Sequence, residues 1–152
     1  MEIDPWYISG FVDGEGSFLV SFSKRQNMAM GVEVRPSFTV SQHERNKEVV
    51  CQLQRFFHCG SVRFNTRDQT YKFEVRSLSD LTNRVIPHFE AYPLLTSKQK
   101  DFESLRHVCH LMVHKAHLTH NGIEQIIKSS YLMNNLGARR YTMNNLLRMV
   151  RR

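Results

Sequence analysis

Two carboxylates near the start of the chain stand between residues that have no side chain. Asp13 and Glu15 alternate with Gly14 and Gly16, and the sequence that follows has the alternation of a β-strand. Carboxylate oxygens suit a hard divalent cation such as Mg²⁺, which binds proteins through one or two carboxylates. With a phosphate oxygen as a further ligand, such a cation activates water and stabilises a leaving oxygen. Phosphodiester hydrolysis is therefore the chemistry that these residues indicate.

The residues before these acids have the pattern of a helix with two bare positions on one face. Gly10 and Gly14 are four residues apart, and small residues at that spacing let two helices approach closely. Glycine costs a helix about 0.5–1 kcal/mol relative to alanine, so we expect a close helix partner to compensate. The simplest partner is the same helix of a second copy, which would bring two Glu15 side chains together. In the alternative interpretation, the glycines cap a helix end and the acids are solvated.

The overall composition is that of a basic globular protein. The 152 residues carry a formal net charge of +7 with a pI near 9.6, which fits nucleic acid as a partner. No apolar run reaches the roughly 18 residues of a membrane span, and the acidic N-terminal stretch lacks the basic region of a signal peptide. Three cysteines without CxxC spacing favour reduced, buried thiols in an intracellular protein. We expect one domain over residues 1–152 and no membrane partner.

Hydrophobic periodicity predicts an α+β domain. We expect strands at about 17–25, 32–42, 61–66 and 70–76, and helices at about 5–14, 45–57, 78–90, 97–118, 122–135 and 142–150. Two hairpins with helices between them indicate a four-stranded antiparallel sheet with helices on one face. Asp4 is the expected N-cap of the first helix, Pro36 suggests a sheet edge or a bulge, and Gly137 separates the last two helices.

The face of the sheet away from the helices is predicted to be polar and positively charged. A merely solvated face is the alternative, but such a face more often has balanced lysine and glutamate pairs. Arginine and asparagine suit bidentate contacts with purine edges in the DNA major groove, which a β-ribbon can enter. We therefore expect DNA contact from Ser21, Ser23, Arg25, Glu33, Arg35, Ser37, Thr39, Arg63, Asn65, Thr70, Lys72 and Arg76.

The stretch ISGFVDGEG, Ile8 to Gly16, resembles the LAGLIDADG motif of the homing endonucleases. Ser9 and Gly10 take the place of the motif's Ala-Gly pair, and Asp13 and Glu15 take the places of its two acids. The succession of elements over residues 5–118 is also similar to the family's αββαββα core, with residues 119–152 as a helical extension. One copy of the motif implies the homodimeric branch, which cuts long, nearly palindromic double-stranded DNA sites with Mg²⁺ or another hard divalent cation such as Ca²⁺ or Mn²⁺.

The resemblance also implies roles for individual residues. Glu15 and the backbone carbonyl of Gly14 would bind the cation, and Gln42 would organise water or metal near the scissile phosphate. Lys100 would lie near the attacking water, with Lys98 as the alternative. The expected dimer interface consists of Ile8, Gly10, Phe11, Asp13 and Gly14.

Two positions depart from the family's pattern. Glu15 replaces the more common aspartate, so the carboxylate has one more methylene of reach. Asn46 stands where a basic residue is expected, and Arg45 and Lys47 on either side of it are the two candidates for that group.

Two further features compete for a function. His107, His110, His114 and His117 recur along the helix expected at 97–118, and His110 and His114 have the spacing of a zinc-binding pair. The alternative is a solvated or packing stripe, which we favour because no glutamate completes a metalloprotease motif. A basic tail is expected to contact phosphate, or else to be a solvated end, and it consists of Arg139, Arg140, Arg148, Arg151 and Arg152.

Two other functions fit the same fold. The first is an RNA maturase that helps an intron fold, with intron RNA as its partner. The second is a non-catalytic DNA-binding protein in which the acids are structural, and which would need no divalent cation. The resemblance also implies a mitochondrial or chloroplast setting for this intracellular protein.

Overall fold

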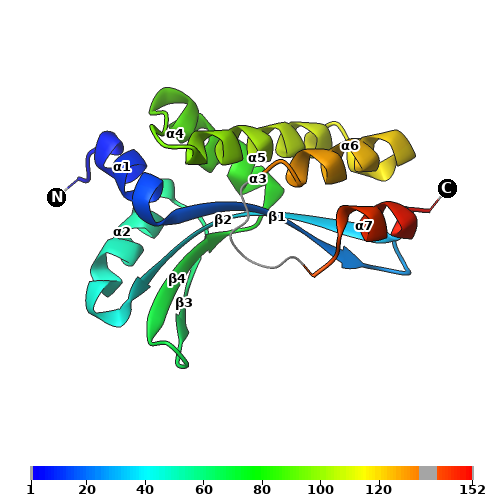
Figure 1. The fold of residues 1–152 in the computed structure, drawn as a ribbon. Coiled ribbons are helices and arrows are strands. Elements are labelled where there is room, and N and C mark those ends of the chain that lie inside the picture. Colours follow the sequence, from blue (N-terminus) through cyan, green and yellow to red (C-terminus); the bar gives the residue numbers. More distant parts are fainter. Residues whose placement is uncertain (1, 134–139, 152) are drawn as a thin grey trace. The chain divides into compact units, whose positions relative to one another are not determined.

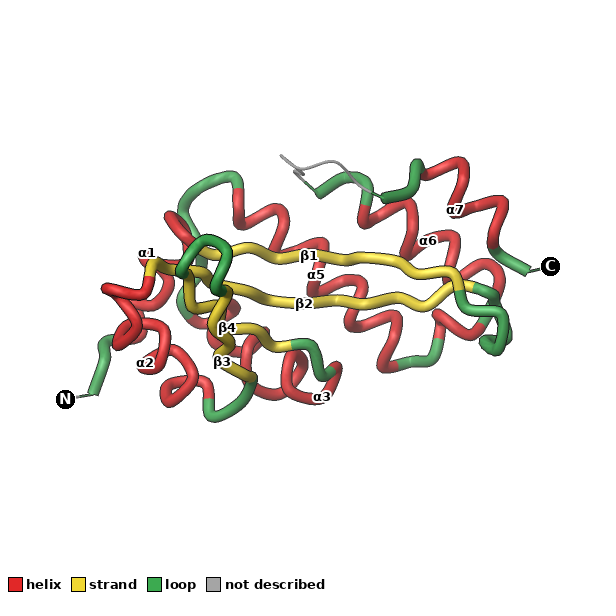
Figure 2. Tube along the Cα trace, turned by 90° about the horizontal axis from the view of Figure 1, so that it is seen from below, coloured by secondary structure: helices red, strands yellow, loops and turns green. Residues whose placement is uncertain are grey.

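Four strands form one sheet in the computed structural model, which describes residues 2–133 and 140–151. β1 (Gly16–Lys24) and β2 (Val32–His43) are consecutive, as are β3 (Ser61–Asn65) and β4 (Thr70–Val75). The strand order is β1-β2-β4-β3, and β4 is antiparallel to both β2 and β3 (Figure 1, Figure 2). The predicted mixed fold with a four-stranded antiparallel sheet is confirmed.

The chain packs as two compact units, each made of two segments. The first unit consists of residues 1–18 and 37–99, and the second contains the described parts of residues 19–36 and 100–152. β1, β2 and α5 (Lys98–Val113) each pass from one unit into the other. The expected grouping, with a core that ends near residue 118 and an extension after it, differs from this division.

An aromatic cluster forms the core of the first unit. Phe38 of β2 has no exposed surface, and its ring centroid lies 5.2 to 6.0 Å from those of Phe18, Phe57, Phe73 and Phe89. Edge-to-face and offset contacts at these distances add to the stabilisation from burial. Phe18, Phe38 and Phe73 come from strands, whereas Phe57 belongs to α2 (Lys47–Phe57) and Phe89 to α4 (Ile86–Ala91). The other helical elements of this unit are α1 (Pro5–Glu15), η1 (Glu44–Asn46), α3 (Leu78–Asp80) and η2 (Leu81–Val85).

Local sequence signals explain where these elements begin and end. The side chain of Asp4 accepts a bond of 2.7 Å from the N–H of Trp6, as predicted for an N-cap. Pro36 precedes Phe38, the first residue of β2 that pairs with β4, so its missing N–H costs no bond to β4. Gly60 has φ +85°, and a Cβ there would lie 2.6 Å from Cε2 of Phe73, so this position requires glycine.

The expected helix at 78–90 starts at the predicted residue but is not regular. Ser77 accepts a bond from the N–H of Asp80, and α3 then runs into the π-helical turn η2. Pro87 lies in the first turn of α4, directly after η2. A π-helical turn changes the hydrogen-bonding partners before a proline, so the chain continues through Pro87 instead of stopping there.

Helices α5, η3 (Ala116–Leu118), α6 (His120–Ser130) and α7 (Met143–Met149) supply the helical part of the second unit. The predicted single helix at 97–118 is wrong, because α5 ends at Val113. Lys115 follows with φ +61°, and a residue in this left-handed conformation ends an α-helix. Gly137, the predicted separator of the last two helices, lies outside the described residues. The apolar core of this unit includes Val20, Phe22, Leu105, Val108, Ile123, Ile126, Ile127 and Leu146.

Two expectations from composition can be compared with the structure. All three cysteines are free, but only Cys109 is buried, while Cys51 and Cys59 are half-buried. Burial raises the pKa of the Cys109 thiol to about 12, so the thiol is protonated at neutral pH. Among the described residues, no helix is both long and apolar enough to cross a membrane.

A buried polar group connects α1 to the end of α4. The hydroxyl of Ser9 donates to the carbonyl oxygen of Tyr92 at 2.6 Å, and its oxygen lies 3.1 Å from Nε2 of His88. Because the hydroxyl has only one proton, Nε2 of His88 must donate to Ser9, and this requirement fixes the tautomer of the imidazole. Burial lowers the pKa of His88 from 6.5 to about 4.

We expect His88 to make the free energy of unfolding depend on pH between about 6.5 and 4. In this window the unfolded chain binds a proton that the folded protein does not. The free energy of unfolding therefore decreases as the pH is lowered, by up to about 3 kcal/mol. Chemical denaturation at about pH 7.5 and about pH 4.5 measures the loss. His88→Gln keeps an N–H donor without a titrating group and should lose less stability. Equal losses in the two proteins would contradict the assignment.

Candidate functional site

Glu15 ends α1, and its exposed carboxylate lies where this helix passes directly into β1. Oε2 of Glu15 accepts a hydrogen bond of 3.1 Å from Nε2 of Gln42, near the end of β2. Oε1 of Gln42 accepts a bond of 3.1 Å from Nδ2 of Asn46. These bonds orient the Gln42 amide, and Oε1 of Glu15 makes no hydrogen bond within the part of the chain that is described. The structure thus brings together two residues that the sequence proposed as partners in one site.

Asp13 differs from Glu15, because both of its oxygens are used within the first unit. Oδ2 accepts from the N–H of Leu95 at 2.7 Å, and Oδ1 accepts from the N–H and the hydroxyl of Thr96 at 3.2 and 2.6 Å. Burial raises the pKa of Asp13, but the Thr96 and Leu95 hydrogen bonds and the charge of Lys98 outweigh it, so the pKa is lowered. Asp13 therefore fixes the connection before α5, a role that sequence reasoning missed.

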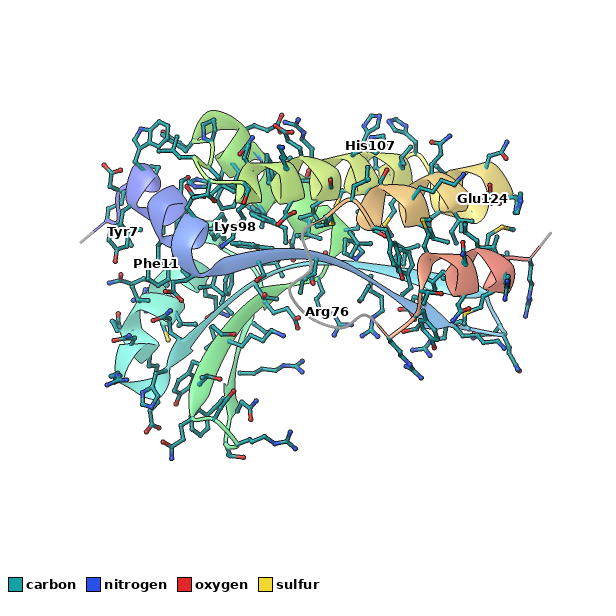
Figure 3. All side chains as sticks on the ribbon, viewed as in Figure 1. Tyr7, Phe11, Arg76, Lys98, His107 and Glu124 are labelled. Carbon is teal, nitrogen blue, oxygen red and sulfur yellow. The ribbon has the colours of Figure 1, made fainter. Side chains whose placement is uncertain are left out.

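Of the two candidate lysines, Lys98 contacts the end of α1. Lys98 is labelled in Figure 3, and its Nζ donates to the carbonyl oxygens of Val12 and Asp13, each at 3.0 Å. A cation at this position binds carbonyls at the negative end of the helix dipole. Lys100 is exposed, and its side chain makes no hydrogen bond or ion pair with another described residue. The contacts assign Lys98 to the helix end, and the predicted role of Lys100 near water stays a prediction.

One face of α1 is open in this chain. A side chain added at Gly10 or Gly14 would meet no atom within 4 Å. Beside these glycines, Tyr7 is 52% exposed and stacks on Phe11, with ring centroids 6.1 Å apart. Ile8 has no exposed surface, so its predicted place in a dimer interface is corrected. The reason is that Ile8 lies on the opposite side of the helix, in the core of its own unit.

A cleft of about 460 Å³ in the first unit connects this face to the residues that support Glu15. Tyr7 and Phe11 line it from α1, and Gln42, Arg45 and Asn46 line it from the end of β2 and from η1. Arg45 is thus the basic neighbour of Asn46 that belongs to the cleft. The other candidate, Lys47, has its Nζ 5.0 Å from the ring centroid of Tyr71.

The first unit holds part of the predicted DNA-contacting surface on three strands. Arg63 lies opposite Lys72, and Asn65 lies opposite Thr70, across β3 and β4. Arg63, Asn65 and Lys72 are exposed, as is Arg76 directly after β4 (Figure 3). Long donors from adjacent strands therefore form one patch.

Other residues of this surface are less accessible than predicted. Ser37 and Thr39 are only 9% and 7% exposed, because these small side chains lie on β2 between two neighbouring strands. Ser41 is exposed on the same strand and lies opposite Lys72. Strand alternation from Thr39 could have found Ser41, which the predicted set left out. Glu74 lies opposite Thr39, and its Oε2 is 3.5 Å from Nζ of Lys72, so the two side chains form an ion pair on β4.

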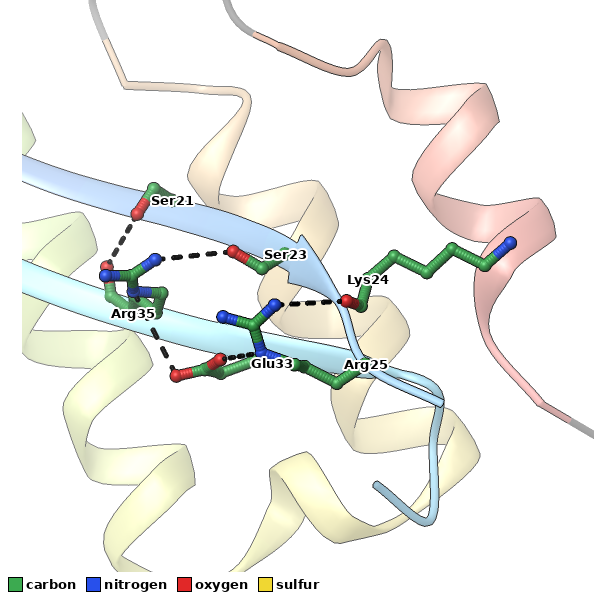
Figure 4. Close-up of polar contacts among 6 residues, drawn as sticks. All are labelled: Ser21, Ser23, Lys24, Arg25, Glu33 and Arg35. Carbon is green, nitrogen blue, oxygen red and sulfur yellow. Dashed lines mark hydrogen bonds and ion pairs between the residues drawn. The ribbon is translucent and has the colours of Figure 1, made fainter. Parts of the chain in front are cut away.

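The second unit holds the other predicted DNA-contacting residues on β1, directly after it at Arg25, and on β2 (Figure 4). Nε of Arg25 donates to Oε2 of Glu33 at 2.9 Å, and Nε of Arg35 lies 4.0 Å from Oε1 of the same carboxylate. Nη1 of Arg35 donates to Oγ of Ser23 at 3.4 Å, and Ser21 donates to the carbonyl oxygen of Arg35. Glu33 thus accepts a hydrogen bond from Arg25 and forms an ion pair with Arg35, and Ser23 is buried beside Arg35.

The histidine stripe does not form a metal site with three protein ligands. Within the described residues, no group of three or more His, Cys, Asp or Glu side chains could hold a metal ion. The rings of His110 in α5 and His114, directly after α5, have centroids 4.5 Å apart, and His107 is exposed on α5 (Figure 3). Burial lowers the pKa of His117, so this ring is neutral at physiological pH. These observations fit a packing and solvated stripe.

Comparison with known proteins agrees with the motif and the fold. The sequence model of the LAGLIDADG endonuclease family matches residues 8–109. Probable intron-encoded endonuclease 3 of Neurospora crassa is 33% identical over 135 residues, which are 88% of this chain and 25% of that protein. An uncharacterised 50.9 kDa protein in ND4 intron 1 of Podospora anserina is 34% identical, over 77% of this chain and 26% of that protein. The chain thus spans about a quarter of the length of these curated relatives.

Solved structures give the same result at greater coverage. The homing endonuclease I-TnaI is 36% identical, with a TM-score of 0.87 over 98% of this chain and 97% of that chain. I-LtrWI, solved bound to its target DNA, is 34% identical, with a TM-score of 0.85 over 90% of this chain and 46% of that one. The family match covers most of the chain, including Glu15, Gln42 and both candidate lysines. This chain belongs to the LAGLIDADG endonuclease family.

Proposed function

We propose that the chain is a site-specific endonuclease that cuts double-stranded DNA as a homodimer with the help of a divalent cation. The observation that carries this proposal is the exposed Glu15 carboxylate, which Gln42 orients at the end of the open face of α1. The target DNA bound by the related I-LtrWI supports double-stranded DNA as the partner. Exposed arginines and lysines on the sheet support the same partner, because they can neutralise phosphates.

The open face of α1 supports the homodimer. Two glycines in a helix cost stability, and the space beside Gly10 and Gly14 is empty, so their benefit does not come from contacts within this chain. A two-fold axis through this face would pair the helices and cover Phe11 and the exposed Tyr7. The same axis would bring the two Glu15 carboxylates together at the centre, one for each DNA strand.

The residues at the end of α1 fit a hard cation such as Mg²⁺. Glu15 has an oxygen free of hydrogen bonds in the described structure, and Gly14 lies in the last turn of α1, where carbonyls lack partners within the helix. One carboxylate and one carbonyl per copy suit Mg²⁺, which completes its coordination with water and substrate phosphate. When bound, the cation polarises the scissile phosphate and lowers the pKa of a bound water.

The chain's own residues have distinct roles in this proposal. Gln42 holds the Glu15 carboxylate in place, and Asn46 holds Gln42. Lys98 fixes the end of α1, and Asp13 fixes the connection before α5. Lys100 has an unpaired ammonium among the described residues, and we propose that it acts on the attacking water, as the resemblance implies. The α1 cleft contributes Arg45 as the basic neighbour of Asn46.

The printed names of relatives support a genetic setting as well. Several are described as intron-encoded endonucleases or as products of ND4 and cox1 introns. We propose that this chain acts in intron homing and that an organelle is its setting. An RNA maturase and a non-catalytic DNA-binding protein stay as alternatives. Cleavage of DNA that requires Mg²⁺ and stops in EDTA separates the proposal from both.

The charge of Glu15 is expected to be essential for cleavage. Glu15→Gln keeps the shape and the contact with Gln42 but weakens cation binding, so cleavage should fall more than about 100-fold while specific DNA binding persists. Selection of cut sites from a randomised plasmid library with Mg²⁺ provides the substrate, and rates on that site provide the measurement. Glu2→Gln removes the same charge from an exposed position and is the matched control. Cleavage by Glu15→Gln at the wild-type rate would show that this carboxylate is not part of the site.

The two lysines are expected to differ in kind. Lys98→Met removes the donor to two carbonyls at the end of α1 and should lower the free energy of unfolding by about 1 kcal/mol. Lys100→Met should leave stability unchanged and lower the cleavage rate by about 100-fold. Thermal denaturation and single-turnover cleavage of both variants give the comparison. If Lys98→Met were stable but inactive and Lys100→Met were active, Lys98 would be the lysine that acts in cleavage, and the proposed assignment would be wrong.

A further inference from the structure

Arg151, two residues after α7, holds the loop that joins β1 to β2. Its backbone N–H donates to the carbonyl oxygen of Met30 at 3.0 Å, and Nη1 donates to that of Met28 at 3.2 Å. Nη2 donates to the carbonyl oxygen of Gln26. One residue thus binds three alternate carbonyls of the seven-residue loop, residues 25–31, and both segments belong to the second unit.

The fit between the loop and Arg151 is close at Gly31. Gly31 has φ +75°, and a Cβ there would lie 3.0 Å from the carbonyl oxygen of Met149 and 3.3 Å from Cγ of Arg151. Leu146 and Val150 anchor the segment that carries Arg151, because they are only 1% and 5% exposed. The buried side chains of its own segment therefore hold Arg151 in place, and the loop packs against Arg151 at Gly31.

These contacts determine what the charge of Arg151 does. A guanidinium presents its donors as a rigid fork that binds several oxygens at once, whereas an ammonium is a point charge on a flexible stem. Both terminal nitrogens of this fork are bound to loop carbonyls, which differs from the phosphate contact expected of a basic tail. Of the other tail residues, Arg139 and Arg152 lie outside the described residues. We propose that Arg151 is a positioning residue that fixes the β1–β2 loop for DNA recognition.

The loop contact continues into a residue expected to read bases. The N–H of Arg25 donates to the carbonyl oxygen of Gly31 at 2.9 Å and closes the loop, and its Nε donates to Glu33 at 2.9 Å. If the loop opened, Arg25 would populate more conformations, and ordering it on DNA would cost more entropy. Arg151 therefore sets the discrimination of Arg25 between bases. This consequence rests on the proposed DNA-binding function, whereas the loop contact itself does not.

Hydrogen exchange in the free protein tests the loop contact without DNA. The amides of Arg25, Met28 and Gly31 donate hydrogen bonds within the loop and report its opening. Arg151→Ala and Arg151→Lys should each speed their exchange about tenfold or more, because lysine keeps the charge but loses the fork. Arg148→Ala removes the same charge from α7 and should leave these rates unchanged. Wild-type exchange rates in both Arg151 variants would overturn the proposal.

Selection from a library of randomised DNA sites tests the consequence for recognition. Arg25→Ala first identifies the base pairs that Arg25 discriminates. Arg151→Ala and Arg151→Lys should both lose about tenfold discrimination at those base pairs and keep it elsewhere. Arg148→Ala should instead weaken binding to all sequences alike, with a smaller salt dependence.

Two outcomes separate the explanations. A uniform loss of affinity in Arg151→Ala that Arg151→Lys restores would identify a phosphate contact, and it would overturn the positioning role. If the wild-type protein selects no DNA sequence at all, the proposed function fails, but the exchange measurement still decides whether Arg151 fixes the loop.

Discussion

The abrupt passage from α1 into β1 is the constraint on which the candidate site depends. A helix that ends within the protein leaves carbonyl groups without partners, and here Lys98 binds two of them. Asp13 binds the connection at residues 95–96, and Gln42 binds Glu15. Three side chains at one helix end therefore hold in place a fourth side chain, the Glu15 carboxylate, which remains exposed.

Glycine is required for different physical reasons at the three glycine positions of the motif. A Cβ at Gly16 would lie 2.6 Å from Cγ1 of Val12, so glycine there lets the strand leave the helix without a gap. Gly10 and Gly14 have empty space around them, so nothing within the chain excludes a side chain at either position. Their reason has to be sought outside the chain, and a second helix is the partner that suits two bare positions four residues apart.

The positively charged side chains of this protein have several different roles, and the net charge of +7 does not distinguish between them. Arg25 and Arg35 share the carboxylate of Glu33, which limits their motion and leaves part of each guanidinium for another partner. Lys98 and Arg151 bind backbone carbonyls and stabilise a helix end and a loop. Arg63 and Arg76 are exposed on the first unit. The positive charges that remain exposed and the positive charges that stabilise the fold thus come from the same two amino-acid types.

The sequence by itself determined the strands, the order of elements and the acidic motif, because these follow from local periodicity and from residue spacing. It also paired Glu15 with Gln42 through the family resemblance. The end of α5 at Val113 and the π-helical turn before Pro87 were not predictable, since both depend on backbone geometry that has no clear local signal. Only the tertiary structure decided that Lys98 binds α1, that Ile8 is core and that Arg151 closes a loop 120 or more residues away. The physical reason is that such contacts join segments distant in sequence, and the spacing of residues along a chain does not specify which of its donors will meet which acceptors.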